Sequence, residues 1–562
     1  MANNAIIGIC AVFLVAMVVA VVVGVTHIKN KNDGEEISSS NKAVQALCQP
    51  TNYKETCQKS LASSNSSDVK ELIRTGFQAG LVEIKNVLAH SVTVQELIKD
   101  ENNKAALGVC QEVLDLAIDD FQKSFDMLGE YDMSKIGKYL LELKTWLSGA
   151  FTSQQTCIDS FAQSSNESSQ KMQSILKTSM EITSNALAML NGLSTIVKEL
   201  NIPNVGNIDT TGVNRKLLSA EDMPEWISQA DRKLLQAKPM DLKPNVVVAK
   251  DGSGKYDTIN KALAEVPVKS PDRFVIHIKA GTYKEKINVT KQMTNVVFIG
   301  DGPTKTIITN DISVAKNPPV RTYRTATVGG VDGAGFMAKD IGFDNSAGPE
   351  GHQAVAFRAT ADRVIMFNCH FTGYQDTLYA HRERQLYSNC LITGTVDFIF
   401  GDAASIFQNC MLIVRKPGPG QNCMVTAQGR NDLGTNSAIV LQNCTISGAP
   451  DYISVKDTNK AYLGRPWKQF ARSIIMQSQI DDIIQPEGYA PMTGTIGIDT
   501  SFIAEFGNRG PGADTSRRVA WKGIKKIDIN EANKWTPRVY LESETWIPSS
   551  GIPYSPDMVP GL

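Results

Sequence analysis

Apolar side chains in the first part of the chain recur at intervals of three and four residues. This spacing puts them on one face of an α-helix, as in the run Leu114, Ala117, Ile118, Phe121, Phe125 and Leu128. Similar patterns occupy residues 68–99, 135–163 and 170–200, with Ser- and Asn-rich breaks between them. About four amphipathic helices with short loops predict an all-α four-helix bundle over residues 40–200. No pattern in this region is typical of a catalytic site.

From about residue 245 the apolar pattern changes to short strands, at 246–249, 273–279 and 296–299. The dipeptide Asn-Cys then recurs at intervals of 21, 20 and 34 residues, at Asn368-Cys369, Asn389-Cys390, Asn409-Cys410 and Asn443-Cys444. The longest interval contains residues 417–420 (PGPG), which predict an inserted loop. A β-sandwich also has short strands, but it gives no reason for one dipeptide to recur. A period of about 20 residues is typical of stacked coils. Residues 241–562 are therefore predicted to form an all-β, right-handed parallel β-helix.

Residues 5–25 form an uncharged stretch that is long enough to span a bilayer as a helix. Lys29 and Lys31 follow it and no basic residue precedes it, so the basic start of a usual signal peptide is missing. Residues 1–28 therefore indicate either an uncleaved signal anchor or an unusual signal peptide. Both predict delivery to the secretory pathway. Four sequons for N-glycosylation are compatible with that route, at Asn65, Asn166, Asn288 and Asn443.

Residues 201–240 have the composition of a linker, with Pro and Gly residues that break any helix. The tetrapeptide Arg-Lys-Leu-Leu occurs twice, beginning at Arg215 and at Arg232. One copy would be an ordinary basic turn, but two identical copies in an exposed linker favour processing by a protease. The predicted cleavage sites are the basic pairs Arg215-Lys216 and Arg232-Lys233.

The net charge of −1 hides an asymmetry between the two halves of the chain. Residues 1–235 carry 21 Lys and Arg against 27 Asp and Glu, whereas residues 236–562 carry 36 against 31. The acidic first part and the basic second part are expected to attract one another. The diffuse positive charge disfavours nucleic acid as a ligand and is compatible with a polyanionic sugar.

The ten cysteines include no CxxC pair and no accompanying His cluster, which disfavours a zinc site. Four of them lie in the helical region, at Cys48, Cys57, Cys110 and Cys157. In an oxidising compartment these predict two disulfides, with three pairings open.

Polar residues of the second half repeat with the same period as the coils. Gln353 and Gln375 are 22 residues apart, and Asp376 and Asp397 are 21 residues apart. One coil apart each time, these residues should converge on one face of the β-helix. Two carboxylates at coil spacing repel, so one should keep a proton while the other stays ionised. Neighbouring amides can donate hydrogen bonds to an oxyanion, so the set predicts acyl chemistry at an ester, and no GxSxG motif occurs. A single Asp or Gln of this kind would be only a turn cap.

Five segments of the second half occur in the order of the pectin methylesterase signatures, and residues 245–560 resemble that family. The segments are 281–285 (GTYKE), 353–358 (QAVAFR), 373–379 (GYQDTLY), 394–401 (GTVDFIFG) and 462–467 (YLGRPW). The helical region is similar to the pectin methylesterase/invertase inhibitor domain in architecture, position and its four cysteines. The resemblance implies a pectinesterase with an inhibitor-like pro-domain, which is expected to restrain activity before processing.

The resemblance also implies a role for each matching residue. Asp397 would be the nucleophile toward the C6 methyl ester of a galacturonate unit, and Asp376 the acid and then the base. Gln375 would stabilise the oxyanion with help from Gln353, and Arg465 would orient Asp397. The implied substrate-binding residues are Thr322, Gln353, Tyr379, Phe400, Arg465 and Trp467. No metal or organic cofactor is implied.

The expected substrate is methyl-esterified homogalacturonan of the cell wall, reached by secretion. The chain's own N-terminal domain, a processing protease and inhibitor proteins are the expected partners. Asp402 stands where the family usually has Asn. Cys410 and Cys444 match a familial disulfide, whereas Gly342 stands about where the partner of Cys369 would be.

Three other hypotheses fit parts of the sequence. The chain could be an inactive pectin-binding β-helix, an inhibitor that acts through its bundle, or a β-helix enzyme that cleaves the pectin backbone. The five catalytic-type residues disfavour the first two. A calcium-dependent lyase needs an acidic metal cluster, and a glycosidase needs an acid pair without the two Gln and the Arg.

Overall fold

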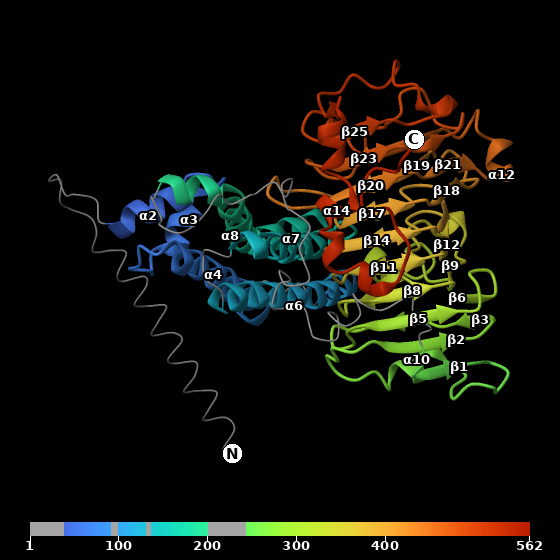
Figure 1. Cartoon of the computed structure of the whole chain (residues 1–562), viewed down its shortest axis with the longest axis horizontal. Coiled ribbons are helices and arrows are strands. Elements are labelled where there is room, and N and C mark those ends of the chain that lie inside the picture. The colour runs from blue at the N-terminus through green and yellow to red at the C-terminus, as the bar shows by residue number, and fades with distance from the viewer. Residues whose placement is uncertain (1–38, 91–98, 131–135, 200–242, 562) are drawn as a thin grey trace.

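The computed structural model describes residues 39–90, 99–130, 136–199 and 243–561 as a helical bundle packed against a β-helix (Figure 1). The predicted apolar span at 5–25 and the processing pairs Arg215-Lys216 and Arg232-Lys233 lie outside these residues. Of the helices within the described ranges, none combines the length and the apolar character needed to cross a bilayer.

Between residues 39 and 199 the described residues form a bundle around an apolar core. Its long helices are α4 (Val69–His90), α6 (Glu101–Glu130), α7 (Ile136–Ser160) and α8 (Asn166–Glu199), and its short ones are α2 (Ser39–Cys48) and α3 (Lys54–Leu61). The predicted apolar face of α6 points into this core, where Leu114, Ala117 and Phe121 are fully buried. The four-helix prediction is therefore confirmed.

Two disulfides fasten the bundle, as the four cysteines of this region predict. Cys48 is bonded to Cys57, which joins α2 to α3. Cys110 is bonded to Cys157, which joins α6 to α7. The structure thus selects one of the three pairings that the sequence leaves open.

The second part is a parallel β-helix whose described strands form three sheets. The eleven-stranded sheet contains β1 (Val246–Val248), β2 (Phe274–Ile278), β5 (Val296–Gly300), β8 (Met337–Lys339), β11 (Val364–Phe367), β14 (Arg384–Ser388), β17 (Ala404–Gln408), β20 (Ala438–Gln442), β23 (Arg472–Met476), β25 (Phe502–Phe506) and β26 (Ile524–Lys525). The seven-stranded sheet contains β4 (Ile287–Asn288), β7 (Val328–Val331), β10 (Phe357–Ala359), β13 (Leu378–Ala380), β16 (Ile399–Gly401), β19 (Cys423–Gln428) and β22 (Ala461–Pro466). The eight-stranded sheet contains β3 (Gly281–Lys284), β6 (Thr306–Asn310), β9 (Gly342–Asn345), β12 (His370–Thr372), β15 (Leu391–Gly394), β18 (Met411–Val414), β21 (Thr445–Gly448) and β24 (Gln479–Ile480).

Short helices lie between and after the strands of the β-helix. They are α10 (Ile259–Leu263), α11 (Thr322–Thr325), α12 (Pro450–Ile453), α13 (Ile529–Asn533) and α14 (Pro537–Tyr540), with 3₁₀ turns at Pro349–Gly351, Pro511–Ala513, Ser543–Thr545 and Pro548–Ser550. Each central coil gives one strand to each sheet, as β13, β14 and β15 do, and pairs in parallel with the next coil. The β-helix prediction is confirmed.

The repeated Asn-Cys dipeptide forms the corner between the eleven-stranded and the eight-stranded sheets. Asn368, Asn389, Asn409 and Asn443 all have a left-handed backbone there, with φ between 49° and 57°. Asn adopts this conformation more readily than most residues, and the Asn443 amide also donates to Oδ1 of Asn409 at 2.8 Å. The Cys that follows each Asn is buried inside the coil. The corner thus explains why the dipeptide recurs.

The 34-residue interval between Cys410 and Cys444 differs in detail from the prediction of one inserted loop. Residues 415–422, which include the PGPG segment, separate β18 from β19, but residues 429–437 form a second loop between β19 and β20. The strand β19 is itself longer than β16. The additional residues of this interval are therefore divided between two loops and a longer strand.

The disulfide that the resemblance implies between Cys410 and Cys444 is absent from the structure, where both are buried free thiols. Sγ of Cys410 lies 3.5 Å from the carbonyl oxygen of Tyr387, and Sγ of Cys444 lies 3.3 Å from that of Phe407. Each thiol thus donates to a backbone carbonyl of the preceding coil, and the prediction is corrected on this point.

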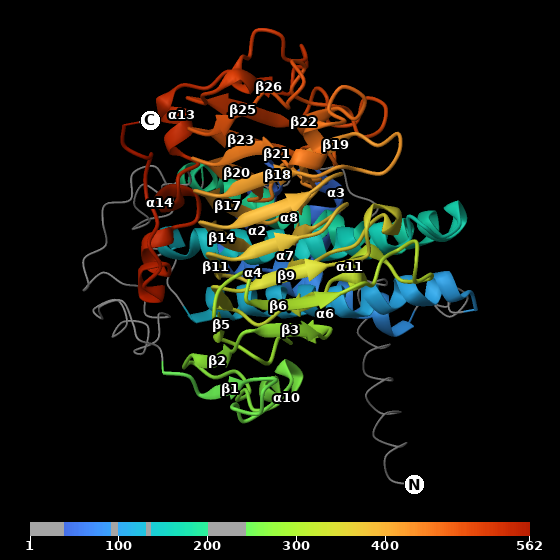
Figure 2. The same ribbon diagram turned by 90° about the vertical axis from the view of Figure 1, so that its right-hand side faces the viewer.

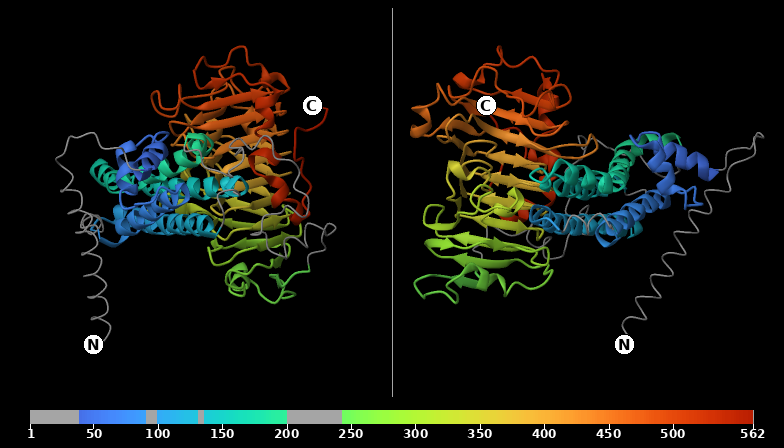
Figure 3. Two further views of the ribbon diagram at one scale, coloured as in Figure 1. Left: turned by 60° about the vertical axis from the view of Figure 1, so that its left-hand side comes forward. Right: turned by 180° about the vertical axis from the view of Figure 1, so that it is seen from behind.

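The bundle lies against the middle of the β-helix, with coils extending beyond it at both ends (Figures 2 and 3). It covers the outer face of the seven-stranded sheet, because Tyr379 of β13, Phe400 of β16 and Ala427 of β19 belong to the same buried cluster as the bundle core. This is also the face toward which the predicted catalytic residues converge.

Candidate active site

The predicted catalytic residues stand at the entrance to successive strands of the seven-stranded sheet. Gln353 precedes β10, Gln375 and Asp376 precede β13, and Asp397 precedes β16. Backbone hydrogen bonds stack these segments, from Ala354 N to Gln375 O at 3.2 Å and from Asp376 N to Val396 O at 3.0 Å. The coil period therefore brings the four residues together.

The backbone at both carboxylates is left-handed, with φ of 64° at Asp376 and 51° at Asp397. Each Asp sits where the chain turns into its strand, and this turn directs the side chain toward the outer face. Asp376 and Asp397 are both 7% exposed and both line one pocket of about 360 Å³. Gln353, Gln375 and Arg465 line the same pocket.

Arg465 of β22 holds Asp397 with two hydrogen bonds. Its Nε donates to Oδ1 at 2.7 Å and its Nη2 donates to Oδ2 at 2.6 Å. This bidentate geometry fixes the plane of the carboxylate as well as its charge. In sheet register Arg465 lies beside Ala427, which lies beside Phe400. The small Ala427 leaves room for the pocket between the guanidinium and the aromatic ring.

The electrostatics of the two carboxylates differ. Burial, and then the negative charge of Asp397, raise the pKa of Asp376 well above its ordinary value. Burial raises the pKa of Asp397 as well, but the hydrogen bonds and charge of Arg465 oppose that rise. Of the two carboxyl groups, Asp376 therefore favours its proton more strongly, while Arg465 favours the ionised form of Asp397.

Aromatic side chains form the wall of the pocket next to the carboxylates. Tyr379 and Phe400 pair across β13 and β16 and stack with ring centroids 4.2 Å apart. Phe400 meets Trp467 edge to face at 6.0 Å. Thr322 of α11 completes this set at the pocket. All six predicted substrate-binding residues line the pocket. Within the described ranges, the pocket included, no three His, Cys, Asp or Glu side chains group as a metal site requires.

Family models match both parts of the chain. Residues 245–544 match the pectinesterase model, and residues 42–189 match the model of the plant invertase/pectin methylesterase inhibitor. "Probable pectinesterase/pectinesterase inhibitor 21" of Arabidopsis thaliana is 45% identical over 99% of this chain and 82% of its own length. The chain belongs to the pectinesterase family.

Further similar proteins agree with this assignment. Pectinesterase/pectinesterase inhibitor U1 of Solanum lycopersicum is 40% identical over 97% of this chain and 95% of its own length. The solved pectin methylesterase from carrot is 45% identical, with a TM-score of 0.56, and covers 57% of this chain and 99% of its own. The principal core of the β-helix contains residues from Val246 to Ile503 and none of the bundle. The β-helix of this pectinesterase therefore corresponds to nearly the whole of the solved carrot chain, and its principal core needs no residue of the bundle.

The inhibitor-like bundle of this pectinesterase forms one wall of the catalytic pocket. Thr156, Asp159 and Gln163 line it from the bundle side. Asp159 pairs with Lys468 at 2.5 Å, next to Trp467. Gln163 accepts a hydrogen bond from buried Arg321 at 2.9 Å. Arg321 directly precedes Thr322, and Lys468 directly follows Trp467. The sequence singled out neither Arg321 nor Lys468.

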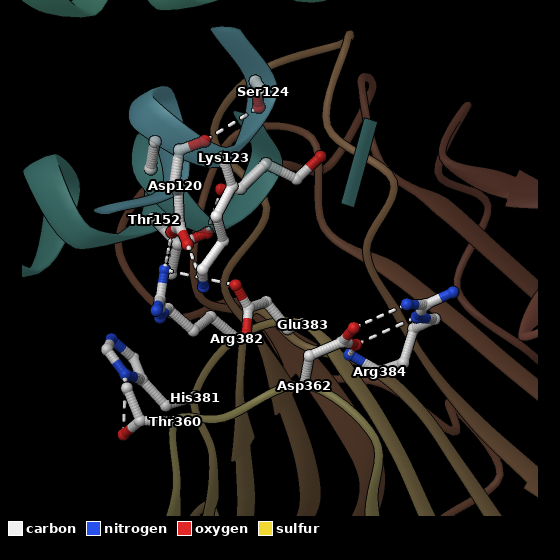
Figure 4. Close-up of polar contacts among 12 residues, drawn as sticks. Asp120, Lys123, Ser124, Thr152, Thr360, Asp362, His381, Arg382, Glu383 and Arg384 are labelled. Atoms are coloured by element: carbon white, nitrogen blue, oxygen red, sulfur yellow. Dashed lines mark hydrogen bonds and ion pairs between the residues drawn. The ribbon is translucent and has the colours of Figure 1, made fainter. Parts of the chain in front are cut away.

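Among the residues that the structure describes, eight ion pairs join the two parts, and in each the acid comes from the bundle and the base from the β-helix. They pair Lys291 with Asp115 and Asp119, Arg324 and Arg358 with Glu112, Arg363 and Arg384 with Glu142, Arg382 with Asp120, and Lys468 with Asp159. Figure 4 shows the centre of this contact, where Arg382 and Glu383 lie beneath Asp120 and Lys123 of α6. The expected attraction between the acidic and basic halves is therefore found at this contact.

Two further predictions concern Asp402 and the glycosylation sequons. Asp402 does not line the pocket, and it accepts a hydrogen bond from Thr152 of α7 at 2.6 Å. The sequon residues Asn65, Asn166 and Asn288 are exposed, whereas Asn443 is partly buried in its ladder.

Proposed function

We propose that this pectinesterase hydrolyses the C6 methyl esters of homogalacturonan through an acyl-enzyme on Asp397. The observation that carries the proposal is the split between two adjacent carboxyl groups, one held ionised by Arg465 and the other favouring its proton. A nucleophile and a general acid are the two groups that ester cleavage by this route requires.

In the first step an oxygen of Asp397 attacks the C6 carbonyl carbon, and the carbonyl oxygen becomes an oxyanion. The side-chain amides of Gln375 and Gln353 line the same pocket, and they donate to that oxygen. As the tetrahedral intermediate collapses, its bond to the methoxy oxygen breaks and Asp376 gives that oxygen its proton. Methanol leaves, and an anhydride joins Asp397 to the uronic acid.

In the second step the now ionised Asp376 removes a proton from water, and the water oxygen attacks the C6 carbonyl. The anhydride bond to Asp397 breaks, and the galacturonic acid is released and loses its proton to the solvent. Asp376 ends the cycle protonated and Asp397 ends it ionised, so both return to the state that their surroundings favour. Tyr379, Phe400 and Trp467 offer flat apolar faces for the sugar rings.

The bundle is proposed to restrain this activity in the uncut chain. Tyr379 and Phe400 are 4% and 5% exposed because the bundle covers them. A polymeric substrate cannot lie along the seven-stranded sheet while α6 and α7 occupy its outer face. Cleavage at Arg215-Lys216 or Arg232-Lys233 is proposed to free the bundle, and the mature enzyme then acts in the cell wall.

Substitution of the nucleophile tests the chemistry on residues 243–562. Asp397→Ala should abolish methanol release, and Asp376→Ala should lower it by about 10²–10⁴-fold. Asp499→Ala, which removes a surface carboxylate paired with Lys522 at 3.5 Å, is the control and should leave the rate unchanged.

Mass spectrometry of enzyme quenched during turnover distinguishes an acyl-enzyme from simple base catalysis. The peptide that contains Asp397 should carry the uronyl group. Methanol release at the wild-type rate by a folded Asp397→Ala protein would overturn the assignment.

A further inference from the structure

Lys286, Lys291, Arg324 and Arg358 form a basic patch on the β-helix, outside the catalytic pocket. Lys286 and Lys291 flank β4, Arg324 belongs to α11 and Arg358 to β10. These elements lie on the coils that precede the one carrying Asp397, because β4, β7, β10, β13 and β16 are neighbours in that order. The patch therefore extends the catalytic face along the axis of the β-helix.

The cations of the basic patch are close enough to disfavour one another. Burial lowers the pKa of Lys286, and the charges of Arg358 and Arg324 lower it further. Lys286 Nζ donates to the carbonyl oxygen of Arg324, and Arg358 lies over the ring of Tyr323 at 3.3 Å. Like charges held together in this way form a strong attractor for an anion.

In the full chain, carboxylates of α6 supply the anions. Glu112 contacts Arg324 at 3.0 Å and Arg358 at 3.3 Å. Lys291 lies between Asp115 at 2.6 Å and Asp119 at 2.8 Å. All the ion pairs recorded for these three cations in the described residues are with the bundle. Asp332 of the β-helix lies near Lys291, but burial raises its pKa to about 7, so it is mostly neutral below that pH.

The three acids of α6 follow one another at intervals of three and four residues. Glu112, Asp115 and Asp119 therefore lie along one side of the helix, with a rise of about 5 Å from each to the next. Such a helix presents a line of regularly spaced carboxylates. A de-esterified galacturonan is also a line of carboxylates, one on each sugar, and the reaction of a pectinesterase produces it.

We propose that the basic patch is a subsite for the free carboxylates of a de-esterified galacturonan strand, and that the acidic side of α6 imitates that strand. The inference rests on the proposed release of the bundle, and it does not depend on the roles assigned to Asp376 and Asp397. After release, the part of the polymer that has already been de-esterified stays bound while the next esters enter the pocket. This arrangement favours the hydrolysis of successive methyl esters along one polymer.

Binding of fully de-esterified polygalacturonate to residues 243–562 tests the proposal. This probe carries no methyl ester, so binding is measured without turnover. The double variant Lys291→Gln/Arg324→Gln should bind it roughly 3- to 10-fold more weakly, since an exposed ion pair changes a binding constant by up to about fivefold. Added salt should reduce the difference.

Two control variants test whether the loss of binding is specific to the basic patch. Lys522→Gln/Lys526→Gln removes the same charge from exposed residues near the far end of the β-helix, where Lys522 pairs with Asp499, and should bind like wild type. Lys291→Arg/Arg324→Lys keeps the charge and should retain binding. Equal loss in the control pair, or none in the patch variant, would overturn the proposal.

The uncut full chain provides an independent measurement. In it Lys291 and Arg324 are already paired with carboxylates of the bundle, so it should bind polygalacturonate more weakly than residues 243–562 do. Equal affinity of the two proteins would show that the patch is not the binding surface. Failure of Asp397→Ala to lose activity would overturn the mechanism and leave this binding result unaffected.

Discussion

Burial and Arg465 act on the pKa of Asp397 in opposite directions, and the balance between them decides whether this carboxyl group is ionised. Arg465 donates two hydrogen bonds of 2.7 and 2.6 Å to Asp397, while Asp376 receives the larger effect of burial and of the neighbouring charge. The same guanidinium therefore sets both the orientation and the charge of the proposed nucleophile.

Arg465→Lys separates orientation from charge. Lysine keeps the positive charge but loses the fork that holds both oxygens. A hydrogen bond to a charged group contributes about 1.5–3 kcal/mol, so kcat for methanol release should fall about 10- to 100-fold with less change in KM.

Arg518→Lys is the matched control, because Arg518 forms the same bidentate contact with Glu505, at 2.8 and 3.0 Å, outside the pocket. It should leave kcat unchanged. An equal loss of kcat in both variants would attribute the effect of Arg465 to folding.

At this scale the sequence predicted the convergence of Gln353, Gln375, Asp376 and Asp397, because each pair is separated by one coil. It could not place Arg465 by spacing, since 68 residues and a lengthened coil separate it from Asp397. That residue came from the family resemblance. Repulsion between the carboxylates predicted the direction of the pKa difference, but burial proves to be the larger cause.

Helix α7 packs closely against the β-helix at Gly149. A Cβ atom there would lie 2.7 Å from Nη1 of Arg382, 3.0 Å from Oε1 of Glu383 and 3.1 Å from Oδ2 of Asp120. A glycine inside a helix costs about 1 kcal/mol relative to alanine. The bundle thus gives up helix stability at the position where it meets the β-helix.

Gly149→Ala should therefore stabilise α7 and weaken its contact with the β-helix. In the uncut chain this should raise methanol release several-fold toward the rate of residues 243–562, which tests the proposed restraint. Gly137→Ala in the same helix is the control, because a Cβ there meets no atom within 4 Å. Unchanged activity in the uncut Gly149→Ala chain would contradict the proposed restraint.

The sequence predicted the long helices and the coils, but not every loop between the strands. Helical spacing predicted the long helices of the bundle because their apolar faces are buried against one another. The Asn-Cys repeat predicted the coils because each corner requires a left-handed residue. The loop at 429–437 was not predicted, since its role depends on the bundle: Asn431 donates to Gln155, and Asp432 accepts from Ser184.

The whole molecule depends on a contact rich in buried charge. Glu383 is covered by the bundle, and burial, with a contribution from Asp120, raises its pKa to about 8 despite Arg382 and Lys123. Burial and Glu112 raise the pKa of Asp332 to about 7, although Arg382 and Lys291 oppose this. Asp362, which also faces Glu383, has a pKa of about 2 beside Arg384 and stays ionised.

These shifts predict that docking of the bundle weakens as the pH rises. The docked form binds protons more tightly than the released form, in which an exposed Glu returns toward its ordinary pKa of 4.5. The stabilisation from Glu383 is complete below pH 4.5 and that from Asp332 below pH 3.8, and both are lost as the pH rises to about 8. The ratio of the rate of the uncut chain to that of residues 243–562 should rise roughly tenfold or more between pH 5 and pH 8.

Both rates share the pH dependence of the chemistry, so this dependence cancels in their ratio. Glu383→Gln, which cannot titrate, should flatten the profile. A ratio that is constant over this range would show that the two carboxyl groups do not control docking. The sequence predicted that the halves attract, but which carboxyl groups become buried depends on how α6 and α7 lie on the sheet.

Asp376 and Asp397 both occupy a left-handed turn, and both are buried with a raised pKa. Glycine fits such a turn without steric cost, and asparagine fits it without a charge to bury. Selection for the proposed chemistry thus holds carboxylates where other residues would suit the coil better. In a duplicated gene freed from that selection, loss of catalysis is a step toward greater stability. The scaffold and its sugar-binding face are then able to outlast the chemistry over evolutionary time.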